Sequence, residues 1–138
     1  MLLEEIRSML EESGLSALQE EGMLVLMIGE EEREVVIYIV TEEEREIAYI
    51  LATAYPPLKA EGRELDLLRA SWDLVDKGLP CKVAMDRGSA VVEMDLDRCH
   101  IDRDYLLRSV YYVAEGMLSL MKRFGHADQG QGDPRVQE

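Results

Sequence analysis

The ionisable side chains that could carry out chemistry are densest in residues 93–104, EMDLDRCHIDRD. Carboxylates and an imidazole can act as general acid and base, or bind a cation, when they converge in a concave and partly dry pocket. The simpler interpretation is the polar face of a strand followed by a helix cap, and Asp102 is well placed as that cap. We favour the strand and cap, and we keep an enzyme that uses Asp95, Asp97 or His100 as the lesser alternative.

The two cysteines, Cys81 and Cys99, offer a second kind of chemistry, but they do not form a CxxC pair. Cys99 adjoins His100, yet adjacent side chains on a strand or turn are expected to point apart. A zinc site would need further ligands, and the other histidine, His126, falls in a predicted tail. We therefore expect two reduced, packed cysteines and neither a metal nor a cofactor.

An acidic string, EEERE, occurs twice, at residues 30–34 and 42–46. Each copy lies between β-branched and aromatic runs, where the chain must reverse. A calcium loop would also require glycine and a fixed Asp/Asn spacing, and neither is present. We interpret both copies as solvated turns whose charges discourage edge-to-edge aggregation, with a cation or basic-ligand site as the lesser alternative.

The composition is strongly acidic, because 29 Asp and Glu against 15 Lys and Arg give a net charge of −14 in 138 residues. Nucleic-acid backbones and anionic lipid surfaces repel such a chain on average. Its apolar runs are far shorter than the roughly 20 residues of a membrane-spanning helix. The acidic N-terminus does not resemble a signal peptide. We expect a cytoplasmic protein with no nucleic-acid or membrane partner.

The elements that position these residues follow from hydrophobic periodicity. Helices are predicted over residues 2–12, 63–77 and 103–124. Strands are predicted at 23–28, 34–40, 46–53, 81–86 and 89–96, with an extended lead-in before the first. Because the strands come in hairpin-linked groups, the order α-β-β-β-α-β-β-α indicates an α+β fold with an antiparallel sheet.

The domain prediction is a single α+β domain over residues 1–124. Residues 125–138, GHADQGQGDPRVQE, lack apolar periodicity and are rich in Gly, Gln, Asp and Pro. We expect them to form a flexible C-terminal tail.

The hairpin around Arg87 and Gly88 has a register that can be read from the sequence. If these two residues form the turn, Lys82 faces Glu93 as a cross-strand ion pair. The opposite face of the hairpin is then wholly apolar, and Cys81 lies on it. The register is therefore internally consistent.

The strands at 23–28 and 34–40 do not alternate apolar with polar residues. An antiparallel sheet with one solvated face should alternate. We therefore expect both faces of the sheet to be covered. The covering can come from the chain's own helices, from a second copy of the chain, or from a bound segment.

The last helix carries a wider apolar stripe than a simple surface helix. It is either the central core helix or a helix that buries a second face against a partner. Trp72 lies on the stripe of the preceding helix, where a core position is the main interpretation and a ligand groove the alternative. The predicted partner or dimer interface consists of Val110, Tyr111, Val113, Met117, Leu120, Met121 and Trp72.

The segment SWDLVDKGLPCKVAMDRGSAVVEMDLD, residues 71–97, resembles the YbjN family within the type III secretion chaperone-like fold. In YbjN-like sequences a helix ends with a tryptophan-containing segment. A short break, a KV-x-x-D-x-G hairpin and a long C-terminal helix follow. Trp72, Lys82–Val83, Asp86 and Gly88 stand in those positions. The order of elements extends the resemblance to most of the chain.

This resemblance implies a homodimer and no catalytic residues. Secretion chaperones of this shape are small and acidic, and they bind an extended effector segment along apolar grooves. YbjN-like proteins are linked to regulation and stress. Together with the acidity and the apolar sheet, the resemblance predicts a non-enzymatic homodimer that captures a protein partner through apolar surface. A dedicated type III secretion chaperone is the alternative.

Overall fold

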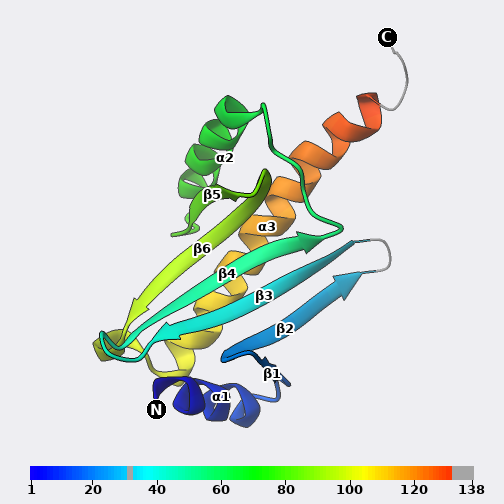
Figure 1. Cartoon of the computed structure of the whole chain (residues 1–138). Helices are drawn as coiled ribbons and strands as arrows, with labels where there is room; N and C mark the ends of the chain where they lie inside the picture. The colour runs from blue at the N-terminus through cyan, green and yellow to red at the C-terminus, as the bar shows by residue number, and fades with distance from the viewer. Residues whose placement is uncertain (31–32, 132–138) are drawn as a thin grey trace.

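The computed structural model describes residues 1–30 and 33–131. It confirms the α+β class and adds one short strand to the predicted meander (Figure 1). In chain order the elements are α1 (Leu2–Glu12), β1 (Leu18–Glu20), β2 (Met23–Glu30), β3 (Arg33–Glu42), β4 (Ile47–Tyr55), α2 (Glu64–Asp76), β5 (Lys82–Asp86), β6 (Ser89–Asp97), the 3₁₀ turn η1 (Arg98–His100) and α3 (Arg103–Gln131).

The strands form one antiparallel sheet of six strands in the order β1-β2-β3-β4-β6-β5. The predicted hairpin register is confirmed, because Lys82 pairs with Glu93 and Ala84 pairs with Val91. The turn residues Arg87 and Gly88 both have positive φ, which glycine adopts freely and other residues adopt rarely. The Lys82 Nζ atom lies 3.6 Å from a Glu93 carboxylate oxygen, as the cross-strand pair requires.

Helices α1 and α3 cover one face of the sheet (Figure 1). Most strand residues on this face are buried, although Ile28 and Met85 are 42% and 38% exposed. The buried ones include Leu24, Ile37, Ile50, Val92 and Met94. Helix α2 adds three buried residues to the same core, Leu67, Ala70 and Leu74. The alternate strand residues point to the opposite face, which we call the open face.

Helix α3 is the central core helix, which is the first of the two interpretations that the sequence left open for it. Its wide apolar stripe is buried within the chain's own core. Gly116 allows a close approach to the sheet, because a Cβ at this position would lie 2.9 Å from Val92 Cγ1. The helix continues beyond its predicted end at residue 124 to Gln131, since the first residue that must break it, Pro134, comes later. The predicted tail is therefore helical over residues 125–131, and its remainder lies outside the described residues.

The second EEERE copy forms a turn, as predicted, but it is more than a solvated turn. Glu43 is half-buried, and its carboxylate accepts hydrogen bonds from the backbone N–H groups of Leu2 at 2.9 Å and Leu3 at 3.3 Å. The Thr41 hydroxyl donates to the same carboxylate at 2.6 Å. Glu43 therefore caps the first turn of α1, where unpaired N–H groups favour a negative charge. The first copy includes residues 31–32, which lie outside the described residues.

Of the three coverings that the sequence left open, the chain's own helices supply one, and within the described residues they cover one sheet face only. Helices α1 and α3 lie on one side, and no described helix covers the open face. The remaining alternatives for the open face are a second copy of the chain and a bound segment.

The Glu43 cap generates a pH-dependent prediction. Hydrogen bonds from Thr41 and from the Leu2 amide hold the pKa of Glu43 below its usual range. A lowered pKa stabilises the fold above the ordinary carboxylate range, and this contribution is lost as the pH falls through the lowered value. We expect Glu43→Ala to lower the melting temperature at pH 7, and the difference from the wild type to shrink at acidic pH.

The neighbouring exposed Glu44 provides the matched control, and Glu44→Ala should leave the melting temperature nearly unchanged. Thermal unfolding followed by circular dichroism between pH 3 and 7 measures both variants. Equal losses for the two variants, or a Glu43→Ala loss that does not depend on pH, would contradict the capping role.

Candidate functional site

The open face is predominantly apolar, because the strands carry apolar residues at outward as well as inward positions. Tyr38 and Val40 of β3, Leu51 of β4 and Val91 of β6 all lie on it. Val91 and Val36 are shielded by their neighbours, whereas Met27 is 60% exposed. An exposed apolar patch on a folded protein is a candidate interaction surface.

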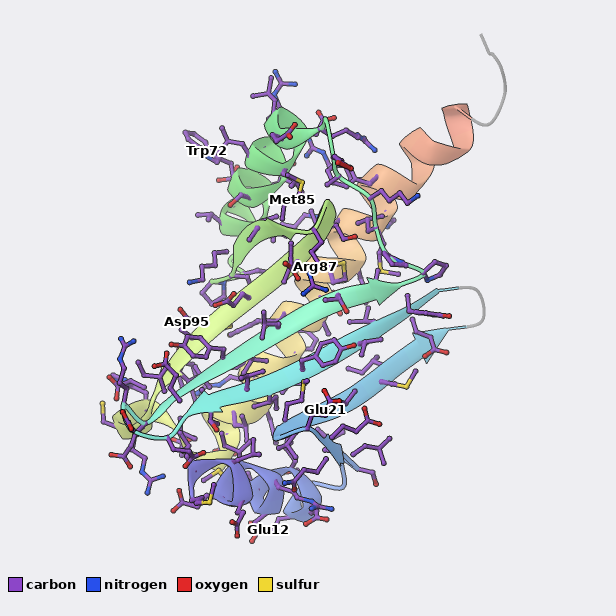
Figure 2. All side chains as sticks on the ribbon, in the orientation of Figure 1. Glu12, Glu21, Trp72, Met85, Arg87 and Asp95 are labelled. Atoms are coloured by element: carbon purple, nitrogen blue, oxygen red, sulfur yellow. The ribbon has the colours of Figure 1, made fainter. Side chains whose placement is uncertain are left out.

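A shallow groove of about 860 Å³ runs over this face. Its floor includes residues of β2, β3, β4, β6 and β5, so the groove crosses the sheet from Met23 to Ala84. Asp86, Arg87 and Glu93 contribute the charged part of its lining. Arg87, Asp95 and Glu21 border the sheet at separate places (Figure 2). The groove can therefore bind an apolar segment that carries charges along its sides.

A charged cluster occupies one border of the open face, at β5 and β6. The Lys82 ammonium donates a hydrogen bond to Asp95 at 2.8 Å and lies beside Glu93. A hydrogen bond shared with Asp95 and partial burial raise the pKa of Glu93. Partial burial opposes the charged form of Asp95, but hydrogen bonds from Glu93 and Lys82 lower the pKa of Asp95 overall. The three side chains thus form a polar rim. Of the two carboxyl groups, Glu93 is protonated more readily than Asp95.

The acidic segment 93–104 is divided between two places, so it does not form one catalytic pocket. Glu93 and Asp95 lie on the open face, whereas the segment after Asp97 turns away at η1. Asp102 caps α3 by accepting a hydrogen bond from the Tyr105 amide at 2.8 Å, as predicted. The strand-and-cap interpretation is confirmed. Within the described residues, no group of three or more His, Cys, Asp or Glu side chains is arranged to hold a metal ion.

Cys99 is a free cysteine, but its predicted packing is wrong because the residue is exposed. The prediction that its side chain points away from His100 is also wrong, because the two side chains lie close together. The Cys99 Sγ atom is 3.5 Å from His100 Nδ1 and 3.5 Å from an Asp97 carboxylate oxygen. The 3₁₀ turn brings the adjacent side chains together, which an extended strand would not do. Desolvation and the Asp97 carboxylate raise the pKa of Cys99. The thiolate is therefore disfavoured, and the trio lacks an activated nucleophile.

Helix α2 presents a second apolar surface, which we call the α2 stripe. Its members are Leu65 (58% exposed), Leu68 (57%), Trp72 (71%) and Val75 (65%). The helix packs through Leu67, Ala70 and Leu74 instead, so the expectation of a core position for Trp72 is wrong. The Trp72 side chain points away from the body of the protein (Figure 2). Spacings of three and four residues place the stripe on one face of the helix.

The predicted interface residues separate into two groups. Val110, Val113, Met117 and Leu120 are buried in the chain's own core. Trp72 and Tyr111 are exposed, and Met121 is half-buried. A partner can therefore contact Trp72 and Tyr111 directly without opening the core.

No helix within the described residues is both long enough and apolar enough to cross a membrane.

Comparison with known proteins identifies the fold. No protein-family model matches the chain, and no curated protein sequence matches it. Solved structures of small α+β proteins do match over nearly the whole chain. YbjN from E. coli is 16% identical, with 88% of this chain and 92% of YbjN covered at a TM-score of 0.63.

Two structures of complexes contain chains of the same fold. The ExsC–ExsE complex matches at 18% identity, with 88% of this chain and 89% of that chain covered at a TM-score of 0.60. The HopA1–SchA chaperone–effector complex matches at 16% identity, with 89% of each chain covered at a TM-score of 0.56. The YbjN-like, secretion chaperone-like fold inferred from the sequence is confirmed.

The two thiols should differ sharply in reactivity. Burial raises the pKa of Cys81 to about 11, whereas Cys99 is exposed. We expect DTNB to modify Cys99 alone in the folded protein and Cys81 only after unfolding in urea. Because the pKa of Cys99 is itself raised, its labelling rate should keep rising at alkaline pH above the range of an ordinary thiol.

The variants Cys99→Ser and Cys81→Ala assign the signal to each thiol. Rapid labelling of folded Cys99→Ser, or a Cys99 rate that levels off near neutral pH, would contradict these assignments.

Proposed function

We propose that this protein is a non-enzymatic, cytoplasmic binding protein that captures a segment of a partner protein on its open face. The observation that carries the proposal is the apolar groove of about 860 Å³ on a sheet face that no described helix covers. The size of this groove lies within the roughly 300–1,000 Å³ range of ligand-binding clefts.

Burial of apolar area supplies the free energy of capture in this proposal. Each square ångström of apolar surface removed from water contributes about 25 cal/mol. Tyr38, Val40 and Leu51 are half-buried in the groove, so a bound segment removes their remaining exposed area from water. The net charge of −14 keeps this apolar surface soluble and favours encounters with basic partners.

The structural neighbours support a protein-binding role in place of catalysis. One is a chaperone–effector complex and another is the ExsC–ExsE complex, so this fold holds protein partners elsewhere. The ionisable groups of residues 93–104 lie in two separate places, and the pKa of Cys99 is raised. These arrangements favour binding over acid–base or nucleophilic chemistry.

A dedicated secretion chaperone is the second candidate, favoured by the HopA1–SchA neighbour in particular. Such a chaperone would hold one effector at a fixed stoichiometry. A regulator of the YbjN kind would instead bind its partners transiently, or would bind several different partners. The two candidates share the open face and differ in what is bound there.

Substitution of one apolar residue in the groove tests whether the open face captures the partner. We expect Leu51→Asn to abolish retention of a partner when the tagged protein is isolated from its host. Leu118→Asn is the matched control, because Leu118 is an exposed leucine on α3, away from the open face. Native mass spectrometry gives the mass and stoichiometry of each complex.

A single partner at a fixed ratio, lost only in Leu51→Asn, would favour the dedicated chaperone. A partner retained equally by both variants would exclude the open face as the capture surface.

We also propose that the α2 stripe forms the homodimer interface. Its four apolar side chains are each more than half exposed, and burying such a side chain stabilises an assembly by about 1.5–3 kcal/mol. Met85 of the edge strand β5, which packs beside α2, is also exposed and extends the surface. Tyr111 of α3 is the rival interface residue, but only Leu118, 40% exposed and seven residues further along the helix, joins it as an exposed large apolar side chain among the described residues of α3.

The two interface candidates are separated by parallel substitutions. We expect Trp72→Glu to convert a dimer to a folded monomer, because a glutamate on the stripe would bury an unpaired charge. Tyr111→Glu should leave the dimer intact. Light scattering coupled to gel filtration gives the mass, and circular dichroism confirms that each variant is folded. A dimer that survives Trp72→Glu and dissociates with Tyr111→Glu would assign the interface to α3 instead.

A further inference from the structure

Carboxylates border the apolar groove on several sides. By strand register, seven of them lie at outward positions of the sheet. Nearby cations are fewer: Lys82 lies on β5 and Arg87 in the adjoining turn, Lys59 belongs to a backbone β-bridge with Ser89, and Arg45 lies 3.4 Å from Glu42. The seven carboxylates are Glu20, Glu34, Glu42, Glu93, Asp95, Asp97 and Asp86.

This charge pattern separates two occupants of the open face. A second copy of the chain would place like charges opposite one another around the groove, which is unfavourable. A partner segment with lysine or arginine beside its apolar residues would instead pair with the bordering carboxylates. The open face is therefore complementary to a basic amphipathic segment and not to itself.

The direction of the groove indicates the conformation of that segment. The groove crosses the strands, and the backbone groups of the interior strands β2, β3, β4 and β6 are already paired within the sheet. An extended segment lying across them would find no backbone partners there. A helix satisfies its backbone hydrogen bonds internally. Helix α3 already packs against β3, β4 and β6 on the opposite face in this way.

The width of the groove sets the length of such a helix. The groove spans β2, β3, β4, β6 and β5 in sheet order. Neighbouring strands lie about 4.8 Å apart, so the span is roughly 19 Å. A helix rises about 1.5 Å per residue, and this span therefore corresponds to roughly 13 residues.

We infer that the ligand of the open face is an amphipathic helix of roughly 13 residues whose apolar stripe is bordered by lysine or arginine. This inference rests on the proposed capture function and specifies the chemistry of the captured segment. The leucine-type side chains of the helix would lie on Tyr38, Val40 and Leu51. Its basic side chains would lie near carboxylates such as Glu34 and Asp86 at the borders.

Designed peptides test the inference with the full-length protein. The first probe is a fluorescein-labelled peptide of roughly 13 residues, with leucines at i, i+3, i+4 and i+7 bordered by lysines. The second replaces every lysine with glutamate, and the third keeps the lysines but carries two interior prolines that prevent a helix. The fourth keeps the lysines and replaces the leucines with serine. Fluorescence anisotropy measures the dissociation constant of each.

We expect the lysine-bordered helix to bind about tenfold or more tightly than each of the other three peptides. The double variant Glu34→Gln with Asp86→Asn should weaken its binding a few-fold, and added salt should reduce that difference. Leu51→Asn should weaken it without changing the net charge of the protein.

Two results would overturn the inference and leave capture on the open face intact. In both, Leu51→Asn still weakens binding, but either the glutamate peptide or the proline peptide binds as tightly as the lysine helix. A third result, in which no peptide is sensitive to Leu51→Asn, would overturn both the inference and the proposed capture surface.

Discussion

The packing of helix α3 against one face of the sheet is the contact on which the rest of the structure depends. Gly116 lets the helix approach Val92 closely, and the apolar stripe of the helix then fills the core. Helix α1 completes the same layer and is held at its first turn by the Glu43 carboxylate. Because both helices lie on one side, no described helix covers the outward apolar residues of the strands. The open face is thus a direct consequence of where α3 lies.

Local patterns allowed much of the fold to be predicted. The register of β5 and β6 follows from two-residue periodicity around Arg87–Gly88, and Asp102 is a cap because of its place before an apolar helical stripe. The covering of each sheet face could not be predicted in the same way. Strands that are apolar on both faces indicate that two coverings are needed, but periodicity does not say where they come from. Helix α2 presents the same difficulty, since Leu67 and Leu68 are both apolar and only tertiary packing decides which is buried.

Sequence reasoning also missed side chains whose contacts depend on the local path of the backbone. Glu43 is one of several glutamates in an acidic turn, and only the position of α1 distinguishes it from exposed Glu44. Cys99 and His100 meet because residues 98–100 form a 3₁₀ turn, which neither residue type predicts. The predicted interface residues on α3 were selected for their apolar character, and the same character places most of them in the core. Trp72 differs because it belongs to a helix with apolar residues on more than one side.

The thin attachment of α2 has a consequence for local stability. Only three residues of this helix are buried, and the guanidinium of Arg63, the residue that precedes the helix, lies 4.2 Å from the centre of the Phe124 ring. An element with so little buried area opens at a lower free energy than the global unfolding transition. Amide hydrogens of α2 should therefore exchange with solvent faster than those in the middle of α3. Any assembly that covers the α2 stripe would slow this exchange, and the proposed dimer is one such assembly.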